Sequence, residues 1–323
     1  MKYEEKNLEN LLEVKNLSKK FLLKKSFFGK PIKTLQAVDK VSFKIKKGQT
    51  LGLVGETGSG KSTLGRCIAG LYRPTSGDIL FKDVDIVARA EDKELTKKIQ
   101  MIFQDPYSSL NPKMTAKETI EEALKINNLP KQEDDIISIL EKVGLTREYL
   151  DRFPHELSGG QCQRLGIART LAIDPEFIIC DEPISALDIS NQIKIVNLLE
   201  ELQNSFDLTY LFIAHDLAMV RQISAEIAVM YLGSIVEKAP ADELYINAQH
   251  PYTKELISAI PIPDPNIKSK YINISNKEPA SPINLTQGCK YQNRCMYKKD
   301  ICLRAEPMFI EKGFHSVACH LVN

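Results

Sequence analysis

Apolar residues in the first 54 positions either alternate with polar ones or gather in short runs, which is a pattern of strands. Residues 41–46 read Val-Ser-Phe-Lys-Ile-Lys, the period of a strand with one buried face. Residues 50–54 form a short, mostly apolar run, as expected of a parallel strand buried on both faces. A glycine-rich loop follows, then a helical stretch over 61–71 that Gly70 and Pro74 are expected to end.

The alternation of strands and helices continues further along the chain. Candidate strands cover 99–103, 177–180 and 210–213, and a helix is expected over 189–204. Strands that alternate with helices predict an α/β fold with a mostly parallel sheet. Residues from about 115 to 152 differ, because they show helical spacing, many charges and no convincing strand. We interpret them as part of an inserted helical subdomain of about 105–164.

Length and composition allow about two domains at ~100–200 residues each. The chain has 323 residues, 43% of them apolar, 26% charged and a formal net charge of +1, which argues against disorder and against a basic nucleic-acid surface. No apolar run reaches about 18 residues, so a membrane-spanning segment is not expected. The first ten residues lack the apolar stretch of a signal peptide, which predicts a cytoplasmic protein.

The residue composition of the chain changes after His250. Three prolines within 260–265 cannot continue a helix, since each removes a backbone donor and fixes φ. We interpret this segment as a linker. It divides a first domain of residues 1–260 from a lysine-rich C-terminal extension of residues 261–323.

The strongest chemical signal is the phosphate-loop spacing Gly-x4-Gly-Lys-Ser at 55–62, placed directly after a buried strand and before a helix. Glycines let successive backbone N–H groups point at phosphate oxygens, and the helix N-terminus adds partial positive charge. Lys61 is expected to reach the β- and γ-phosphates, and the Ser62 hydroxyl to ligate Mg²⁺. A glycine turn that binds nothing is the alternative, which the strand–loop–helix context disfavours.

The second signal is an acidic pair, Asp181 and Glu182, at the end of an apolar strand. Ligands of open α/β sheets bind at the carboxyl ends of the strands. Asp181 is therefore expected to hold Mg²⁺ directly or through water, and Glu182 to polarise the attacking water. Such a pair alone is more often a helix N-cap, but its position after a phosphate loop favours the catalytic interpretation.

The third signal is the segment 157–161, Leu-Ser-Gly-Gly-Gln, followed by a helix. Ser158 can cap that helix, and the glycines let backbone N–H groups approach an anion. The bland alternative is a serine-capped helix and nothing more. A second anion site in one chain is most simply used if two chains each close the other's nucleotide site.

Together the segments GETGSGKS (55–62), LSGGQ (157–161) and FIICDEP (177–183) resemble the nucleotide-binding subunits of ABC transporters. The resemblance implies a P-loop, RecA-like core with an α-helical insert and an antiparallel β region. It also implies ATP and Mg²⁺ as cofactors. Two subunits would sandwich the nucleotides, the partner being a homologous ATPase subunit in a heterodimer.

The resemblance extends to single residues. Gln104 matches the glutamine that contacts Mg²⁺ and communicates with the membrane partner, and Asp188 lies in the loop that bridges the dimer. His215 matches the histidine that senses the γ-phosphate. Phe21 occupies the position of the aromatic that stacks on adenine, where the family usually has Tyr. The implied nucleotide-binding residues are Phe21, Gly55, Glu56, Thr57, Gly58, Ser59, Gly60, Lys61, Ser62, Thr63, Ser158, Gly159, Gly160, Gln161 and Asp188. The implied catalytic residues are Glu182, His215 and Gln104, and the implied Mg²⁺ ligands are Ser62, Gln104 and Asp181.

Three longer segments resemble the oligopeptide and dipeptide importer branch, and within it the F-type member of the paired ATPases: QDPYSSLNP (104–112), FPHELSGGQCQRLGIAR (153–169) and HPYTKELISAIPIPDP (250–265). The resemblance implies two transmembrane permease subunits, an extracytoplasmic solute-binding protein and a place at the cytoplasmic face of the membrane. Import of nickel or of another small solute remains an alternative to peptide import. A soluble ABC ATPase without a transport role also stays open, although the single phosphate loop and the near-neutral charge disfavour it. A third hypothesis is a metal sensor in which the ATPase is the regulator.

Four of the seven cysteines lie in the last 35 residues: Cys289, Cys295, Cys302 and Cys319. Four thiolates favour a soft metal centre, either zinc or an iron–sulfur cluster. Paired Cys-x2-Cys motifs are absent, and the wider spacing leaves room for a [4Fe–4S] cluster, which the family resemblance also implies. His315 or His320 could replace one ligand, and free thiols in a flexible tail are the alternative. We expect a structural role for the centre, because so short an extension has little core of its own.

Overall fold

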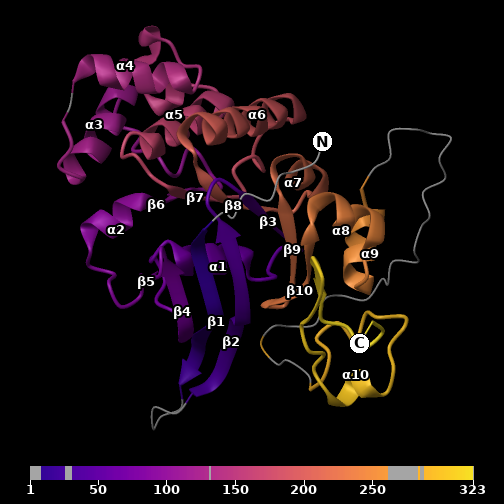
Figure 1. Ribbon diagram of the computed structural model, residues 1–323. Helices are drawn as coiled ribbons and strands as arrows, with labels where there is room; N and C mark the ends of the chain where they lie inside the picture. The colour runs from indigo at the N-terminus through magenta and orange to yellow at the C-terminus, as the bar shows by residue number, and fades with distance from the viewer. Residues whose placement is uncertain (1–8, 26–30, 131, 261–282, 284–286, 323) are drawn as a thin grey trace, which may run out of the picture. The chain divides into compact units, whose positions relative to one another are not determined.

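The computed structural model describes residues 9–25, 31–130, 132–260, 283 and 287–322 (Figure 1). The chain divides into two compact units. The first unit contains residues up to 12, 45–50 and 81–214, and the second contains residues 13–44, 51–80 and 215 onwards. The linker predicted at 260–265 lies almost wholly outside the described residues. None of the helices in the described part of the chain is long and apolar enough to cross a membrane.

The first unit is built on three parallel strands in the order β8-β7-β6. Their bounds are Ile99–Ile102 for β6, Phe177–Asp181 for β7 and Thr209–Ala214 for β8. Every residue of β7 and β8 is buried, as in a parallel sheet covered on both faces. These ranges confirm the three predicted strands, and they bring the carboxyl ends of β6 and β7 to the same edge of the sheet.

A helical insert follows β6 in the first unit. Its helices are α3 (Ala116–Ile126), α4 (Glu133–Lys142) and α5 (Gly159–Leu171), with the short 3-10 turns η1 (Arg147–Tyr149) and η2 (Pro154–Glu156) before α5. A capping box between Thr115 and Glu118 starts α3. The three helices pack against one another (Figure 1). The predicted helical insert is therefore confirmed.

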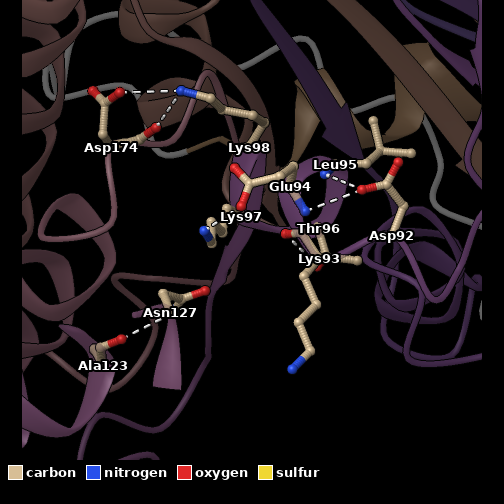
Figure 2. A network of polar contacts seen from close by, with 10 residues as sticks. All are labelled: Asp92, Lys93, Glu94, Leu95, Thr96, Lys97, Lys98, Ala123, Asn127 and Asp174. Atoms are coloured by element: carbon tan, nitrogen blue, oxygen red, sulfur yellow. Dashed lines mark hydrogen bonds and ion pairs between the residues drawn. The ribbon is translucent and has the colours of Figure 1, made fainter. Parts of the chain in front are cut away.

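Three further elements complete the first unit, namely β5 (Val84–Asp85), α2 (Lys93–Lys98) and α6 (Ile189–Phe206). The carboxylate of Asp92 caps α2 by accepting the N–H groups of Glu94 and Leu95 at 3.1 and 3.3 Å (Figure 2). At the other end of α2, Lys98 Nζ donates to the backbone and carboxylate oxygens of Asp174, both at 3.1 Å. The helix is thereby tied to the turn that precedes β7.

The second unit contains two groups of strands. In one, β1 (Asn10–Lys25), β2 (Pro31–Lys46) and β4 (Ser76–Phe81) lie in the order β2-β1-β4. The buried and exposed positions of 41–46 alternate as predicted.

The other group has the order β11-β12-β10-β9-β3. The bounds are Thr50–Val54 for β3, Glu226–Tyr231 for β9, Ser234–Pro240 for β10, Ile310–Lys312 for β11 and His315–Val317 for β12. β3 runs parallel to β9, and the remaining pairs are antiparallel.

The helices of the second unit are α1 (Lys61–Ile68), α7 (Leu217–Ile223), α8 (Ala241–Asn247), α9 (Pro251–Ser258) and α10 (Ile301–Arg304). α1 ends three residues earlier than the predicted Leu71. Gly70 follows the helix at φ +74°, and a residue in this left-handed conformation terminates a helix as soon as it is reached.

A buried carboxylate fastens the end of the chain to the second unit. Glu237 of β10 has no solvent exposure, and it accepts the N–H groups of Gln249 and His250 at 2.6 and 3.0 Å. His315 of β12 meets the same carboxylate through Nε2 at 2.7 Å. His250 in turn caps α9, because its Nδ1 accepts the N–H of Tyr252 at 3.1 Å. The residues 287–322, called the C-terminal lobe below, are thus anchored to β10 and to the start of α9.

Candidate nucleotide site

The loop between β3 and α1 has a backbone path that requires glycine at two positions for steric reasons. A Cβ on Gly55 would lie 2.2 Å from the carbonyl oxygen of Met230, and one on Gly60 would lie 2.1 Å from the carbonyl oxygen of Ala37. Gly60 also has φ +107°, a value that other residues avoid. Gly58, at φ +81°, faces open space at the exposed tip. The glycines of the motif therefore shape a loop that curls in front of α1.

Lys61 lies at the first turn of α1 with its side chain almost fully buried. Its Nζ donates to the carbonyl oxygens of Gly55 and Glu56 at 2.7 and 3.0 Å. The ammonium group is thus held inside the loop, where backbone N–H groups and the start of α1 also concentrate positive potential. Ser62 and Thr63 follow on the same helix and are half-buried. This geometry is suited to a polyphosphate with a bound cation.

Phe21 lies on β1, half-buried. Its ring meets Tyr72 edge to face with 5.5 Å between the ring centroids, and Lys19 Nζ lies 5.0 Å from the Phe21 centroid. An aromatic pair with a nearby cation offers both a stacking face and a positive charge to a purine nucleotide. The adenine-stacking role of Phe21 stays a prediction.

The acidic pair lies at the carboxyl end of β7 in the first unit. Asp181 is buried, and Glu182 takes a left-handed conformation at φ +48° with its N–H bonded to the Ile213 carbonyl of β8 at 2.9 Å. The next helix, α6, is capped by Asp188 instead, so the acidic pair is not its N-cap. Gln104, which follows β6, donates from Nε2 to Glu182 Oε2 at 2.9 Å. Two predicted residues 78 positions apart are therefore in direct contact.

The start of α5 has the geometry that was expected of segment 157–161. The Ser158 hydroxyl accepts the N–H of Gln161 at 3.3 Å, and Gln161 Oε1 accepts the N–H of Ser158 at 2.8 Å. This reciprocal capping box confirms Ser158 as the helix N-cap. Gly160 is buried close to Asn191, whose backbone N–H and side chain both bond to the Asp188 carboxylate. The Asn191 bonds also lower the pKa of the exposed Asp188.

The Gln104 segment and the Ser158 segment are joined by Tyr107. Its hydroxyl donates to the carbonyl oxygen of Leu157 at 3.2 Å, and its ring lies near Gly159. The loop that carries Gln104 is therefore in direct contact with the loop that carries Ser158. Sequence reasoning did not single out Tyr107, although it lies inside the quoted segment 104–112.

Comparison with known proteins identifies two family models that match this chain. Residues 38–185 match the family model of the ABC transporter, and residues 236–302 match that of the oligopeptide/dipeptide transporter C-terminal region. The oligopeptide transport ATP-binding protein AppF of Bacillus subtilis is 46% identical over 98% of this chain and 99% of its own length. The chain belongs to the oligopeptide transport ATP-binding proteins of the ABC transporter family. As an ABC ATPase, it binds and hydrolyses ATP.

Further relatives agree with this assignment. The oligopeptide transport ATP-binding protein OppF of Escherichia coli is 46% identical to this chain, over 97% of this chain and 96% of its own length. A solved structure of the ATP-binding cassette MJ0796, a dimer in a post-hydrolysis state with ADP and phosphate, matches with a TM-score of 0.62 and 29% identity. That match covers 71% of this chain and 98% of the other. The predicted cassette fold is confirmed.

The predicted site residues of the ABC ATPase fall into two groups, one in each unit. The second unit holds Phe21, residues 55–63 and His215, and the first unit holds Gln104, residues 158–161, Asp181, Glu182 and Asp188. Within each group the contacts given above are consistent with the predicted roles. The roles themselves stay predictions.

The four cysteines of the C-terminal lobe influence one another electrostatically. Burial, chiefly, raises the pKa of Cys289 to about 11, and the thiols of Cys302, Cys319 and Cys295 add to this effect. All four sulfurs also accept backbone N–H groups, from Tyr291 to Cys289, from Tyr297 to Cys295, from Leu321 to Cys319 and, at 3.4 Å, from Lys299 to Cys302. Across the described residues, however, no group of three or more His, Cys, Asp or Glu side chains is placed to hold a metal ion.

Sequence reasoning missed a set of residues that contact the phosphate loop of the ABC ATPase, directly or through one another, from distant parts of the chain. Tyr252 of α9 and Arg294 of the C-terminal lobe contact Glu56 directly, and Glu255 of α9 and Tyr291 of the lobe contact Arg294. Arg294 forms two 2.9 Å contacts with the carboxylate of Glu56, 238 positions earlier in the sequence. No local pattern could reveal a pair so widely separated.

Proposed function

We propose that this chain is the ATP-hydrolysing subunit of an ABC importer for oligopeptides or dipeptides. It works at the cytoplasmic face of the cell membrane with a homologous ATPase subunit, two transmembrane permease subunits and an extracytoplasmic solute-binding protein. The peptide substrate is supported by two oligopeptide transport ATP-binding proteins, AppF and OppF, which are each 46% identical to this chain over nearly its whole length. The division into a nucleotide-binding domain of residues 1–260 and an extension of residues 261–323 is part of the same proposal.

Residues 55–62 are proposed to hold the ATP phosphates, with Lys61 on the β- and γ-phosphates and Ser62 on Mg²⁺. Phe21 would stack on adenine. Ser158, Gly159, Gly160 and Gln161 would complete the site of the partner subunit across the dimer, and Asp188 would line the interface. His215 would contact the γ-phosphate. The curled glycine loop with Lys61 inside it is the observation that supports this assignment.

Hydrolysis is assigned to Glu182, with Gln104 and Asp181 at the Mg²⁺ ion. A carboxylate at the end of a strand next to the phosphates can orient water for attack on the γ-phosphorus. The 2.9 Å hydrogen bond between Gln104 and Glu182 supports a link between the permease signal and the base. Because Tyr107 connects the same loop to the Ser158 segment, a displacement of this loop would shift the base and the dimer contact together.

A groove on the helical insert supports the docking of a permease segment. It has a volume of about 690 Å³ and is lined by the loop before α3 and by α3 itself. Its lining includes Lys113 and Lys125, the acidic side chains Glu118, Glu121 and Glu122, and the exposed apolar side chain Ile126. Such a mixed surface suits a short amphipathic helix of a membrane subunit.

The decisive experiment replaces Glu182 by Gln in the reconstituted transporter. We expect ATP hydrolysis to fall at least about a hundredfold, because the base is lost, while MgATP binding stays and a closed dimer accumulates on gel filtration. Glu201→Gln, at an exposed position of α6, is the matched control and should leave hydrolysis unchanged. Normal turnover in Glu182→Gln would refute the assignment. Uptake of labelled nickel instead of labelled peptide, or copurification with ribosomes, would replace the peptide-import proposal.

The proposed metal centre at Cys289, Cys295, Cys302 and Cys319 is a further part of this function. Four thiols that all accept backbone N–H groups form a donor set that fits a soft metal, because such bonds lower the thiol pKa and so oppose the burial that raises it. In the described residues the four sulfurs are not placed as a ligand group, so metal binding would bring them closer together. A [4Fe–4S] cluster or, alternatively, Zn²⁺ would cross-link the lobe in a structural role.

The metal content of protein purified without oxygen tests this proposal. We expect about four iron and four sulfide per chain with visible absorption, or about one zinc without it. Cys302→Ser should lower the metal content, whereas Cys67→Ala, at a buried cysteine outside the lobe, should leave it unchanged. Protein that contains neither metal when freshly prepared would refute the centre.

A further inference from the structure

A buried ion-pair network joins the phosphate loop to α9 and to the C-terminal lobe within the second unit. Its centre is Arg294, whose side chain is only 7% exposed. The guanidinium contacts both carboxylate oxygens of Glu56 at 2.9 Å and one oxygen of Glu255 at 2.7 Å. Burial alone would lower the pKa of Arg294, but its hydrogen bonds to Glu255 and Glu56 outweigh that effect and raise it. The cation is therefore permanent.

The backbone of Glu56 is held as firmly as its side chain. Its N–H donates to the hydroxyl of Tyr252 on α9 at 2.9 Å. Tyr291 donates to the Glu255 carboxylate, and the rings of Tyr252 and Tyr291 pack against each other and beside Arg294. The Arg294–Glu255 pair is buried beside these rings and is screened little by solvent, whereas the Glu56 carboxylate is 31% exposed.

Glu56 is the second residue of the phosphate loop, and its carbonyl oxygen accepts a hydrogen bond from Lys61 at 3.0 Å. The limb of the loop that Arg294 and Tyr252 hold is therefore the limb that positions the Lys61 ammonium. A loop held in its binding conformation loses less conformational entropy when it binds a ligand. Release of Glu56 would leave Lys61 and the neighbouring N–H groups to be ordered by the nucleotide itself.

We propose that Arg294 is a positioning residue for ATP binding, which acts through Glu56 on the phosphate loop without touching the nucleotide. Tyr252 completes the clamp from α9. This function rests on the proposed assignment of residues 55–62 as the phosphate loop. It gives the C-terminal lobe a direct part in nucleotide affinity, independent of any metal that its cysteines bind.

A double-mutant comparison tests the clamp in the full-length protein, with MgADP binding measured by titration calorimetry. Arg294→Met and Glu56→Gln should each raise the dissociation constant about tenfold. The double variant should lose no more than Arg294→Met alone, because that change already breaks the Arg294–Glu56 pair, together with the Arg294–Glu255 pair. Arg294→Lys, which keeps the charge without the planar fork, should recover part of the affinity. Arg304→Met, at an exposed position on α10 of the same lobe, is the matched control and should bind normally.

The outcomes separate the clamp from a merely structural role. A lower melting temperature with unchanged MgADP affinity in Arg294→Met and Glu56→Gln would overturn the proposal, and so would fully additive losses. Lys61→Ala distinguishes the two layers of the argument. If Lys61→Ala binds MgADP like the wild type, the assignment of the phosphate loop fails. If only Lys61→Ala loses binding, the loop assignment stands and the clamp fails.

Discussion

The buried imidazole of His250 should make the stability of this protein fall in mild acid. His250 caps α9 through the lone pair on Nδ1, and burial lowers its pKa from 6.5 to about 3. The folded state therefore keeps His250 neutral where the unfolded chain already binds a proton. A lowered histidine pKa gives stability that is fully present above about pH 6.5 and that is lost as the pH falls toward 3.

The magnitude follows from these two pKa values. Between about pH 7.5 and about pH 5, the unfolded chain gains nearly one proton at this position and the folded state gains almost none. The free energy of unfolding should therefore drop by about 2 kcal/mol through His250 alone. Asn is a good N-cap that does not titrate, so His250→Asn should keep the start of α9 and remove this part of the pH dependence.

The assay is urea unfolding followed by far-ultraviolet circular dichroism, because the chain has no tryptophan. The wild type should lose about 2 kcal/mol more than His250→Asn over this pH range, whatever the offset between the two proteins at neutral pH. His155→Asn is the control, since His155 is exposed to water when folded as well as when unfolded. Parallel pH curves for the wild type and His250→Asn would refute the reasoning.

Five other substitutions, in three comparisons, test the nucleotide site. Gly60→Ala should destabilise the protein by about 2–5 kcal/mol and abolish nucleotide binding, because the new Cβ would lie 2.1 Å from the Ala37 carbonyl oxygen. In Gly58→Ala the new Cβ meets no atom, so this variant should lose only about 1–2 kcal/mol of stability, for its positive φ. Thermal melts compare the two variants, and equal losses would contradict the reasoning. Ser158→Ala should lose about 1 kcal/mol of stability and Ser158→Gly only a few tenths of a kcal/mol, because glycine is itself an acceptable N-cap. Both variants should nevertheless lose ATPase activity if the Ser158 hydroxyl acts across the dimer. If the loss of activity instead followed the loss of stability, Ser158 would be only a helix cap. Tyr107→Phe removes the hydrogen bond to the Leu157 carbonyl. In a steady-state assay it should lower the ATPase rate about threefold and leave the MgATP affinity unchanged. A change in affinity alone would argue against the link between the two loops.

Local patterns in the sequence were sufficient to predict most of the catalytic core. The apolar runs at 50–54 and 177–180 became buried strands because parallel strands covered on both faces need continuous apolar residues. Ser158 could also be predicted as the N-cap of α5, since the capping bond lies within four residues, whereas the reciprocal bond from Gln161 was not predicted. The end of α1 was placed too late, because apolar spacing continued to Leu71 while the backbone had already turned at Gly70.

The contacts that sequence reasoning missed are those between residues far apart in the chain. β11 and β12 are three residues long, too short to show an alternation. Glu237 looks like an ordinary strand residue until its carboxylate is seen to bond Gln249, His250 and His315. Arg294 lies among cysteines and lysines, and nothing nearby in the sequence indicates Glu56 as its partner.

The pairing of Arg294 with Glu56 has a practical consequence for any fragment of this protein. A chain cut at residue 260 would still carry every motif by which ABC ATPases are identified, together with Tyr252. It would lack the cation that neutralises Glu56, so an extra negative charge would stand at the entrance for a triphosphate. The shortest fragment that contains all the motifs is therefore not long enough to keep Glu56 neutralised, because that requires the chain to extend at least to Arg294.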